Sequence, residues 1–298
     1  MHLPKKVTII EVGPRDGLQN EKNNIPTDDK IAFIHKLKNA GIKEMELTSF
    51  VSPKWVPQMK DANEVIQACL DNTRNFVLAP NRKGIDRLFE TNCKAVAVFV
   101  GVSETFNKKN INKSTRESME ELQPIIAELK QKNYFVRACI STSFYCPYEG
   151  KINEQEVSKL CSQFVQNGVD ELSVADTIGM ANPKEVFSLF SKLKAQLPDT
   201  LITGHFHDTR GMAIANVFAA LQTGVDRFDT SAGGLGGCPF APGATGNVAT
   251  EDVVYMLEQM GIETGIDLSK LVEAVDIIRP HLTRSIESKY YRLQTQGK

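Results

Sequence analysis

Two histidines of this sequence are spaced so that both can bind one metal ion. His205 and His207 stand two positions apart in LITGHFHD (201–208), a run typical of a β-strand, and alternation along a strand turns both imidazoles to one face. Asp16 and Asn247 can add two oxygen ligands. Two nitrogens and two oxygens leave open positions in an octahedron, which suits Mg²⁺ or Mn²⁺ chelated by a substrate. The alternative is a histidine pair that only satisfies hydrogen bonds.

A thiol stands in the middle of a long glycine-rich segment. Residues 231–247, SAGGLGGCPFAPGATGN, carry Cys238 among glycines and two prolines. A loop of this length within a domain is usually a lid over a site or a disordered segment. Because glycine permits hinge motion and close approach to a ligand, we expect a lid that brings the Cys238 thiol to the site. A flexible turn with an uninvolved cysteine is the alternative.

The pattern of apolar runs predicts how these residues are positioned. Short apolar or β-branched runs alternate with longer amphipathic segments about eight times in about 260 residues. This predicts an α/β protein with a closed parallel (β/α)₈ barrel. An open doubly wound sheet is the runner-up, but neither GxGxxG nor GxxxxGK[ST] occurs, so its usual nucleotide motifs are missing. We expect one catalytic domain, residues 1–298, with the barrel over about 1–262 and a helical extension over about 263–298.

Polar residues lie where the carboxyl ends of the predicted strands would meet, as active-site residues of such barrels do. Arg15 and Asp16 follow the first predicted strand, and Asp176 ends the sixth. Glu46 lies within the otherwise apolar second strand. A buried carboxylate needs a cation or hydrogen-bond donors, and Arg137 of the fifth strand is a candidate partner for Glu46.

A basic patch, ETFNKKNINKS (104–114), follows the fourth predicted strand. Its polar side chains can hold a phosphate-bearing ligand at the same rim, although a solvated lysine loop is an equally good interpretation. The residues concerned are Lys108, Lys109, Asn110, Lys113 and Ser114.

Composition excludes several classes of partner. The formal net charge of −1 gives no field that would attract nucleic acid or an anionic membrane, and no apolar run approaches the roughly 18 residues of a membrane span. The six cysteines show no CxxC spacing, so neither a disulfide framework nor a zinc ribbon is expected. The first predicted strand begins too early to leave room for a targeting segment. We therefore expect a cytoplasmic protein.

Motifs spread over nearly the whole chain resemble those of the 3-hydroxy-3-methylglutaryl-CoA (HMG-CoA) lyases. They are EVGPRDGLQNE, TSFVSPKWVPQM, KKNIN, HFHDTRG and GGLGGCPFAPGATGN. Each alone is weak, but the full set in this order is specific. The resemblance implies a TIM barrel that cleaves HMG-CoA to acetyl-CoA and acetoacetate with a divalent cation, as in leucine degradation. It also implies a homodimer.

The resemblance also implies roles for the candidate residues. The metal ligands would be Asp16, His205, His207 and Asn247, the further catalytic positions Arg15, Glu46, Asp176 and Cys238, and the region that meets the coenzyme A arm Asn110 and Ser114.

The chemistry of this cleavage suggests what each group does. Asp16 or His205 would take the hydroxyl proton, Arg15 would stabilise the enolate oxygen, and Cys238 would protonate the enolate carbon. Glu46 and Asp176 would hold Arg15 and the histidines. Alternatives are a condensing enzyme such as an isopropylmalate or homocitrate synthase, a lyase for another 3-hydroxy-3-methyl acyl-CoA, and an inactive barrel that only binds ligands.

Overall fold

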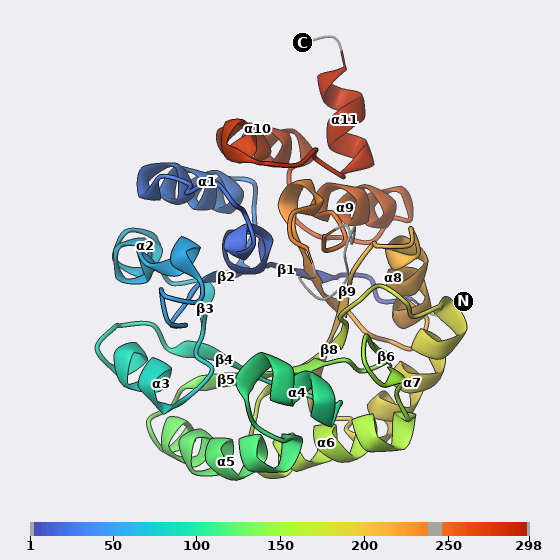
Figure 1. Cartoon of the computed structure of the whole chain (residues 1–298). Helices are drawn as coiled ribbons and strands as arrows, with labels where there is room; N and C mark the ends of the chain where they lie inside the picture. Colours follow the sequence, from blue (N-terminus) through green and yellow to red (C-terminus); the bar gives the residue numbers. More distant parts are fainter. Residues whose placement is uncertain (1–2, 238–245, 297–298) are drawn as a thin grey trace.

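Eight parallel strands form a closed barrel in this computed structural model, which describes residues 3–237 and 246–296 (Figure 1). Around the barrel the strands follow the order β1, β10, β9, β8, β5, β4, β3, β2, so the chain's first and last barrel strands pair with each other. The strands are β1 (Thr8–Glu11), β2 (Glu44–Ser49), β3 (Arg74–Leu78), β4 (Ala95–Gly101), β5 (Phe135–Ser141), β8 (Glu171–Asp176), β9 (Leu201–Phe206) and β10 (Arg227–Thr230). The predicted (β/α)₈ barrel is confirmed.

Helices form a ring around the barrel because each strand is followed by an amphipathic segment that buries one face on the sheet. They are α1 (Thr27–Asn39), α2 (Ala62–Cys69), α3 (Arg82–Phe89), α5 (Thr115–Gln131), α6 (Glu154–Gln166), α7 (Pro183–Gln196), α8 (Ala213–Leu221) and α9 (Thr250–Gln259). Capping boxes at Ser114 with Glu117 and at Asn182 with Glu185 fix where α5 and α7 begin. The main apolar core lies between strands and helices.

A helix, α4 (Glu104–Ile111), occupies most of the segment that we interpreted as a lysine loop. Ser103 caps it by accepting a hydrogen bond from the backbone N–H of Phe106, and Asn107 is buried against both backbone polar groups of Gly101. In Figure 1, α4 is drawn inside the ring of outer helices. A two-stranded hairpin, β6 (Tyr145–Cys146) and β7 (Gly150–Lys151), was not predicted either.

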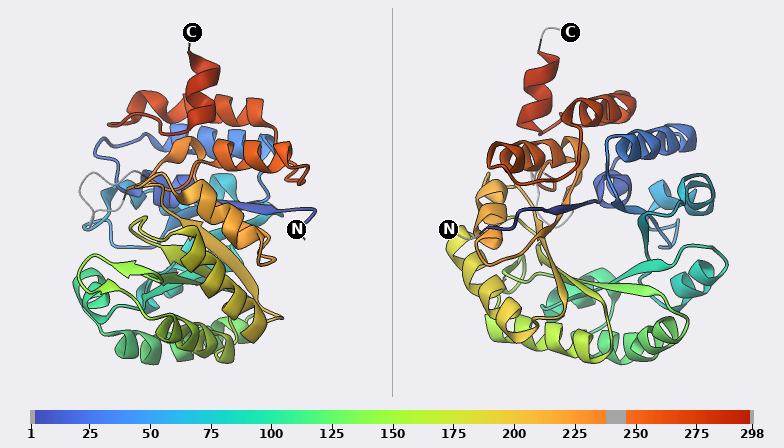
Figure 2. Two further views of the ribbon diagram at one scale, coloured as in Figure 1. Left: turned by 90° about the vertical axis from the view of Figure 1, so that its right-hand side faces the viewer. Right: turned by 180° about the vertical axis from the view of Figure 1, so that it is seen from behind.

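The expected helical extension consists of α10 (Leu268–Ile278) and α11 (Lys289–Thr295). α10 packs on α1 and α9, outside the ring (Figure 2), so it covers the side of the barrel and not its lower end. Short turns complete the structure: the π-helical turn η1 (Gly13–Gly17) and the 3₁₀ turns η2 (Pro57–Met59), η3 (Ala232–Gly234) and η4 (Arg279–His281). Within the described residues, no helix is both long and apolar enough to cross a membrane.

The barrel interior holds paired charges where most barrels of this kind pack branched apolar side chains. Arg227 contacts Glu44 and Glu171, and Arg137 contacts Asp229 and Glu171. All five side chains are largely removed from water, so each charge depends on its partners.

Two carboxyl groups beside the glycine-rich segment are buried without a basic partner in the part of the chain that the structure describes. Glu11 accepts hydrogen bonds from the backbone N–H groups of Gly13 and Ala232 and from the hydroxyl of Thr250. Both oxygens of Glu251 accept from the backbone N–H of Gly233. Burial raises the pKa of Glu11 to about 7 and that of Glu251 to about 8, from an ordinary value of 4.5.

Because these two carboxyl groups have raised pKa values, we expect the free energy of unfolding to fall as pH rises. Between about pH 4.5 and 8 the folded protein keeps protons that the unfolded chain has released, so the free energy of unfolding decreases with pH. Glu251→Gln should flatten this fall by an amount on the order of a few kcal/mol. Urea unfolding at about pH 5 and about pH 8.5 measures it. Glu263→Gln, at an exposed carboxylate, is the control. The prediction would be contradicted if the free energy of unfolding fell equally with pH in Glu251→Gln and in wild type.

Candidate active site

One carboxylate and two imidazoles meet at the carboxyl end of the strands. Asp16 lies in the η1 turn directly after β1, His205 lies in β9, and His207 follows that strand. One potential ligand atom from each of the three lies within 4.8 Å of those from the other two. They converge because β10 pairs with both β1 and β9 in the closed barrel, so the ends of these three strands lie side by side. Side chains in this arrangement can hold a metal ion.

Asn247 adds an amide to this cluster. It forms an antiparallel bridge with His207, and its Nδ2 donates to Asp16 Oδ2 at 2.7 Å. Its Oδ1 and the Nδ1 of His207 are buried and have no hydrogen-bond partner among the residues that the structure describes. Unpaired buried polar atoms are costly, and a cation bound by the cluster would satisfy them. The donor set therefore fits a divalent cation with oxygen and nitrogen ligands.

Arg15 lies beside the cluster and is held by two carboxylates. Its Nε donates to Glu46 Oε2 and its Nη1 to Asp16 Oδ1, both at 2.7 Å. The Glu46 side chain is 1% exposed and that of Arg15 is 11% exposed, so the guanidinium is the member of the pair that faces the mouth. Burial alone would lower the pKa of Arg15, but the carboxylates of Glu46 and Asp16 raise it. The predicted partner of Glu46, Arg137, instead contacts Asp229 and Glu171.

His205 is held by a residue that the sequence analysis missed. Its Nδ1 lies 3.0 Å from Asp229 Oδ2. Asp176, which we expected to hold the histidines, accepts hydrogen bonds from the backbone N–H groups of Met180 and Ala181 and so shapes the loop after β8. Asp229 could have been found by the criterion applied to Glu46, because it too is a carboxylate within a barrel strand, β10.

The electrostatics leave Asp16 and His207 in the ionisation states that bind a cation. Burial opposes ionisation of Asp16, but the charges of Arg15 and the histidines lower its pKa to about 2. Burial, together with His205, lowers the pKa of His207 to about 4, so its imidazole is neutral at neutral pH. An ionised carboxylate and a neutral imidazole are the forms that bind metal ions.

Comparison with known proteins shows the family of the chain. A family model described as HMGL-like matches residues 6–278. The chain belongs to the HMGL-like family. Hydroxymethylglutaryl-CoA lyase YngG of Bacillus subtilis is 47% identical over 292 residues, which is 97% of each chain. The solved structure of the hydroxymethylglutaryl-CoA lyase of Pseudomonas aeruginosa matches with a TM-score of 0.96, 42% identity and full coverage of both chains.

A further HMGL-like relative has been solved with ligands. The structure of an HMG-CoA lyase from Acinetobacter baumannii in complex with coenzyme A and 3-methylmalate has a TM-score of 0.92 and 38% identity, and the match covers 99% of this chain and 96% of that one. The family resemblance inferred from the motifs is confirmed.

An open pocket of about 680 Å³ adjoins helix α4 of this HMGL-like barrel. It is lined by Glu104, Thr105, Lys108, Lys109, Ser114 and Arg116. Of the residues predicted to meet a phosphate-bearing ligand, Lys108, Lys109 and Ser114 line it, whereas Asn110 lies on α4 outside that lining set. Ser114 also caps α5, and Lys113 is paired with Glu121.

The predicted thiol, Cys238, lies outside the described residues. The structure does describe the two residues before it. Arg284 Nη1 donates to the carbonyl of Gly236 at 2.6 Å, and Asn20 Nδ2 donates to that of Gly237 at 2.9 Å. The carboxylate of Glu21 accepts from Thr283 and lies beside Arg284. The segment that leads to Cys238 is thus held by both the N-terminal part and the C-terminal extension.

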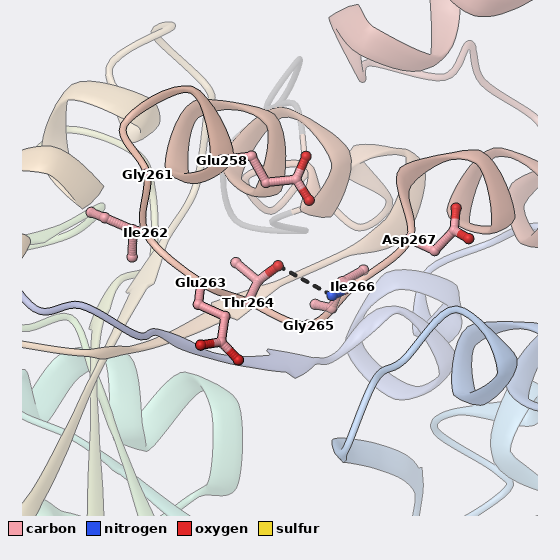
Figure 3. Close-up of a pocket in the computed structure, with 8 residues that line it drawn as sticks. All are labelled: Glu258, Gly261, Ile262, Glu263, Thr264, Gly265, Ile266 and Asp267. Carbon is pink, nitrogen blue, oxygen red and sulfur yellow. Dashed lines mark hydrogen bonds between the residues drawn. The ribbon is translucent and has the colours of Figure 1, made fainter.

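A second pocket, of about 480 Å³, lies beside α9 and is lined by residues 258 and 261–267 (Figure 3). Glu263 of this pocket bridges to Lys6, just before β1 begins. The pocket is therefore at the amino end of the barrel, opposite Asp16, and it contains none of the predicted site residues.

Proposed function

We propose that this chain is a metal-dependent lyase that cleaves (S)-3-hydroxy-3-methylglutaryl-CoA to acetyl-CoA and acetoacetate. The observation that carries this proposal is the cluster of Asp16, His205 and His207 within 4.8 Å, with the guanidinium of Arg15 bonded to it at the barrel mouth. The relatives named above are hydroxymethylglutaryl-CoA lyases, which supports the same reaction and substrate.

The proposed cation is Mg²⁺ or Mn²⁺, with Asp16, His205, His207 and Asn247 as its ligands. When bound, such an ion polarises the substrate's hydroxyl and lowers the pKa of that hydroxyl. The unpaired buried atoms of Asn247 and His207 support this ligand set. Oxygen and imidazole donors without thiolate favour these ions over zinc.

The bond rearrangement defines what the other residues must do. The hydroxyl at C3 loses its proton, C3 becomes the ketone of acetoacetate, and the electrons of the C2–C3 bond pass to the thioester as an enolate. Of the two candidates for taking the hydroxyl proton, Asp16 or His205, we propose Asp16, because His205 is a proposed metal ligand whose Nδ1 lies 3.0 Å from Asp229 Oδ2. Arg15, which stays charged between its two carboxylates, is proposed to stabilise the enolate oxygen. Protonation at C2 then gives acetyl-CoA.

We propose Cys238 as the donor of that last proton, on the basis of the sequence and the family resemblance alone. Cys238→Ser is expected to lower kcat by on the order of 100-fold or more, because a serine hydroxyl is a much weaker acid than a thiol, while Mn²⁺ affinity stays unchanged. Steady-state kinetics and Mn²⁺ titration check both. Cys69→Ser, at a buried thiol on the outer side of the barrel, is the control. A Cys238→Ser variant with nearly wild-type kcat would remove this thiol from the mechanism.

Lys108, Lys109, Asn110 and Ser114 are proposed to meet the coenzyme A arm. The pocket beside α4 carries three cationic side chains, Lys108, Lys109 and Arg116, against one carboxylate, Glu104. A net positive pocket at the rim suits the phosphates of coenzyme A. The Acinetobacter baumannii lyase in complex with coenzyme A supports this class of ligand.

The cellular context is proposed as well. We propose one catalytic domain over residues 1–298 that works as a cytoplasmic homodimer in leucine breakdown. The described cysteines are free thiols, as in a reducing compartment. Light scattering coupled to gel filtration tests the dimer, and a monomer at assay concentrations would contradict it.

The experiment that tests the reaction is acetoacetate release from HMG-CoA by the purified protein, with EDTA and then with added Mg²⁺ or Mn²⁺. We expect release that EDTA abolishes and either metal restores. Acetoacetate release that persists in EDTA would contradict the proposed metal dependence. A folded protein that binds metal but releases no acetoacetate would instead point to another 3-hydroxy-3-methyl acyl-CoA or to a condensing enzyme, which assays with those substrates separate.

A further inference from the structure

Asp229 is a buried carboxylate of β10 that joins the proposed metal site to the charged barrel interior. It is 2% exposed. Its Oδ1 accepts a hydrogen bond from Arg137 Nη2. Its Oδ2 accepts from Ser173 Oγ at 2.7 Å and lies 3.0 Å from His205 Nδ1. Each carboxylate oxygen thus has a separate set of partners.

Arg137 decides the ionisation of Asp229 and, through it, the tautomer of His205. The guanidinium is 1% exposed and contacts both Asp229 and Glu171. Arginine stays charged in proteins, so Asp229 beside it is an anion that can only accept hydrogen bonds. The hydrogen bond to His205 therefore requires a proton on Nδ1. In the neutral imidazole the other ring nitrogen, Nε2, then keeps its lone pair free.

We propose that Asp229 is a positioning residue that fixes His205 with Nδ1 protonated, so that Nε2 is the nitrogen presented to the metal ion. Arg137 holds the carboxylate through its other oxygen, Oδ1. The inference rests on the metal site proposed above. A carboxylate that accepts from the second nitrogen of a histidine ligand orients the ring and makes it a better donor. The competing interpretation is that Asp229 only neutralises Arg137.

An Asp229→Asn variant separates these interpretations. Arg137 can only donate, so the amide oxygen of the new asparagine must face it. The amide nitrogen then faces His205 and donates to Nδ1, which moves the ring proton to Nε2. An asparagine that replaces a histidine-bound aspartate inverts the tautomer in this way. The amide oxygen of the asparagine and the carboxylate of Glu171 still contact Arg137, so the charge of Arg137 keeps partners.

The experiment measures Mn²⁺ binding to wild type and variants by electron paramagnetic resonance of the free ion, with thermal unfolding as a check of folding. We expect Asp229→Asn to weaken Mn²⁺ binding about 10- to 100-fold. Ser173→Ala removes a hydrogen bond from the same oxygen but leaves the contact with His205, so its Mn²⁺ affinity should stay close to wild type. A folded Asp229→Asn variant with wild-type affinity would overturn the proposal, as would an equal loss in Ser173→Ala.

Nitrogen-15 NMR of histidine-labelled wild type reads the tautomer directly and does not depend on whether Asp229→Asn folds. His205→Gln identifies the His205 signals. At a pH where the imidazoles are neutral, we expect a protonated Nδ1 and an unprotonated Nε2, and the opposite tautomer would overturn the inference. If the wild type binds no Mn²⁺ but shows the expected tautomer, the metal dependence in the proposed function would be contradicted. The inference that Asp229 holds His205 would still stand.

Discussion

Replacing Asp16 with alanine is expected to lower kcat/KM for HMG-CoA about 1000-fold and to weaken Mn²⁺ binding in the same protein. Asp16 is the carboxylate of the cluster, and its low pKa keeps it charged at all working pH values. Loss of a ligand that brings the metal to the substrate removes several kcal/mol of stabilisation, and each 1.4 kcal/mol or so is tenfold in rate. Steady-state kinetics at saturating Mn²⁺ and a direct Mn²⁺ titration measure the two effects.

The pairing of the two effects is what tests the assignment of Asp16. A variant that loses rate but keeps Mn²⁺ affinity would show that Asp16 acts on the substrate and is not a ligand. Asp86→Ala removes an exposed carboxylate paired with Arg82 on α3 and should change neither quantity. Because Arg15 keeps Glu46 as a partner in Asp16→Ala, the variant should remain folded.

Replacing Arg15 with methionine is expected to lower kcat about 100- to 1000-fold, which is the usual effect of removing one stabiliser of a developing oxyanion. Mn²⁺ affinity should not fall, because Arg15 is a cation beside the proposed ligand Asp16 and is not itself a proposed ligand. The variant should also lose about 3 kcal/mol of stability, since Glu46 is left buried without its partner. Turnover, Mn²⁺ titration and urea unfolding give the three values.

The double variant Arg15→Met/Glu46→Gln separates catalysis from stability. A neutral amide at position 46 removes the unpaired charge, so the free energy of unfolding should recover most of what Arg15→Met loses. The rate should not recover, because no cation is restored near the enolate oxygen. Recovery of kcat together with stability would mean that Arg15 acts by holding the barrel mouth in shape.

The barrel and the meeting of its polar strand ends could be predicted because both follow from local patterns. Alternating strand and helix periodicity is readable from each segment, and parallel strands carry their end residues to one rim. That rule alone brought Asp16, His205, His207 and Asn247 to one place. The positions of these residues did not depend on details of packing.

The choice of partners inside the barrel could not be predicted, because it depends on how far the strands are staggered. Glu46 and Arg137 both point inward, but the strand register puts Arg137 level with Glu171, deeper in the barrel. A register shift between Glu46 and Thr48 adds to the difference. Stagger and bulges are set by the closed sheet as a whole, so Arg15 as the partner of Glu46 became visible only in the structure.

The hydrogen bonds from Asn20 to Gly237 and from Thr283 to Glu21 join parts of the chain that a ribosome makes at opposite ends of synthesis, 217 and 262 residues apart. One edge of β1 likewise has no strand partner until β10 has been synthesised. Contacts of such long sequence separation form late in folding. A nascent chain that has not yet released residue 284 should therefore hold most of its helices but lack a finished active site. Because Asn247, a proposed ligand that donates to Asp16, is itself made late, Mn²⁺ binding at the proposed site would also be gained late.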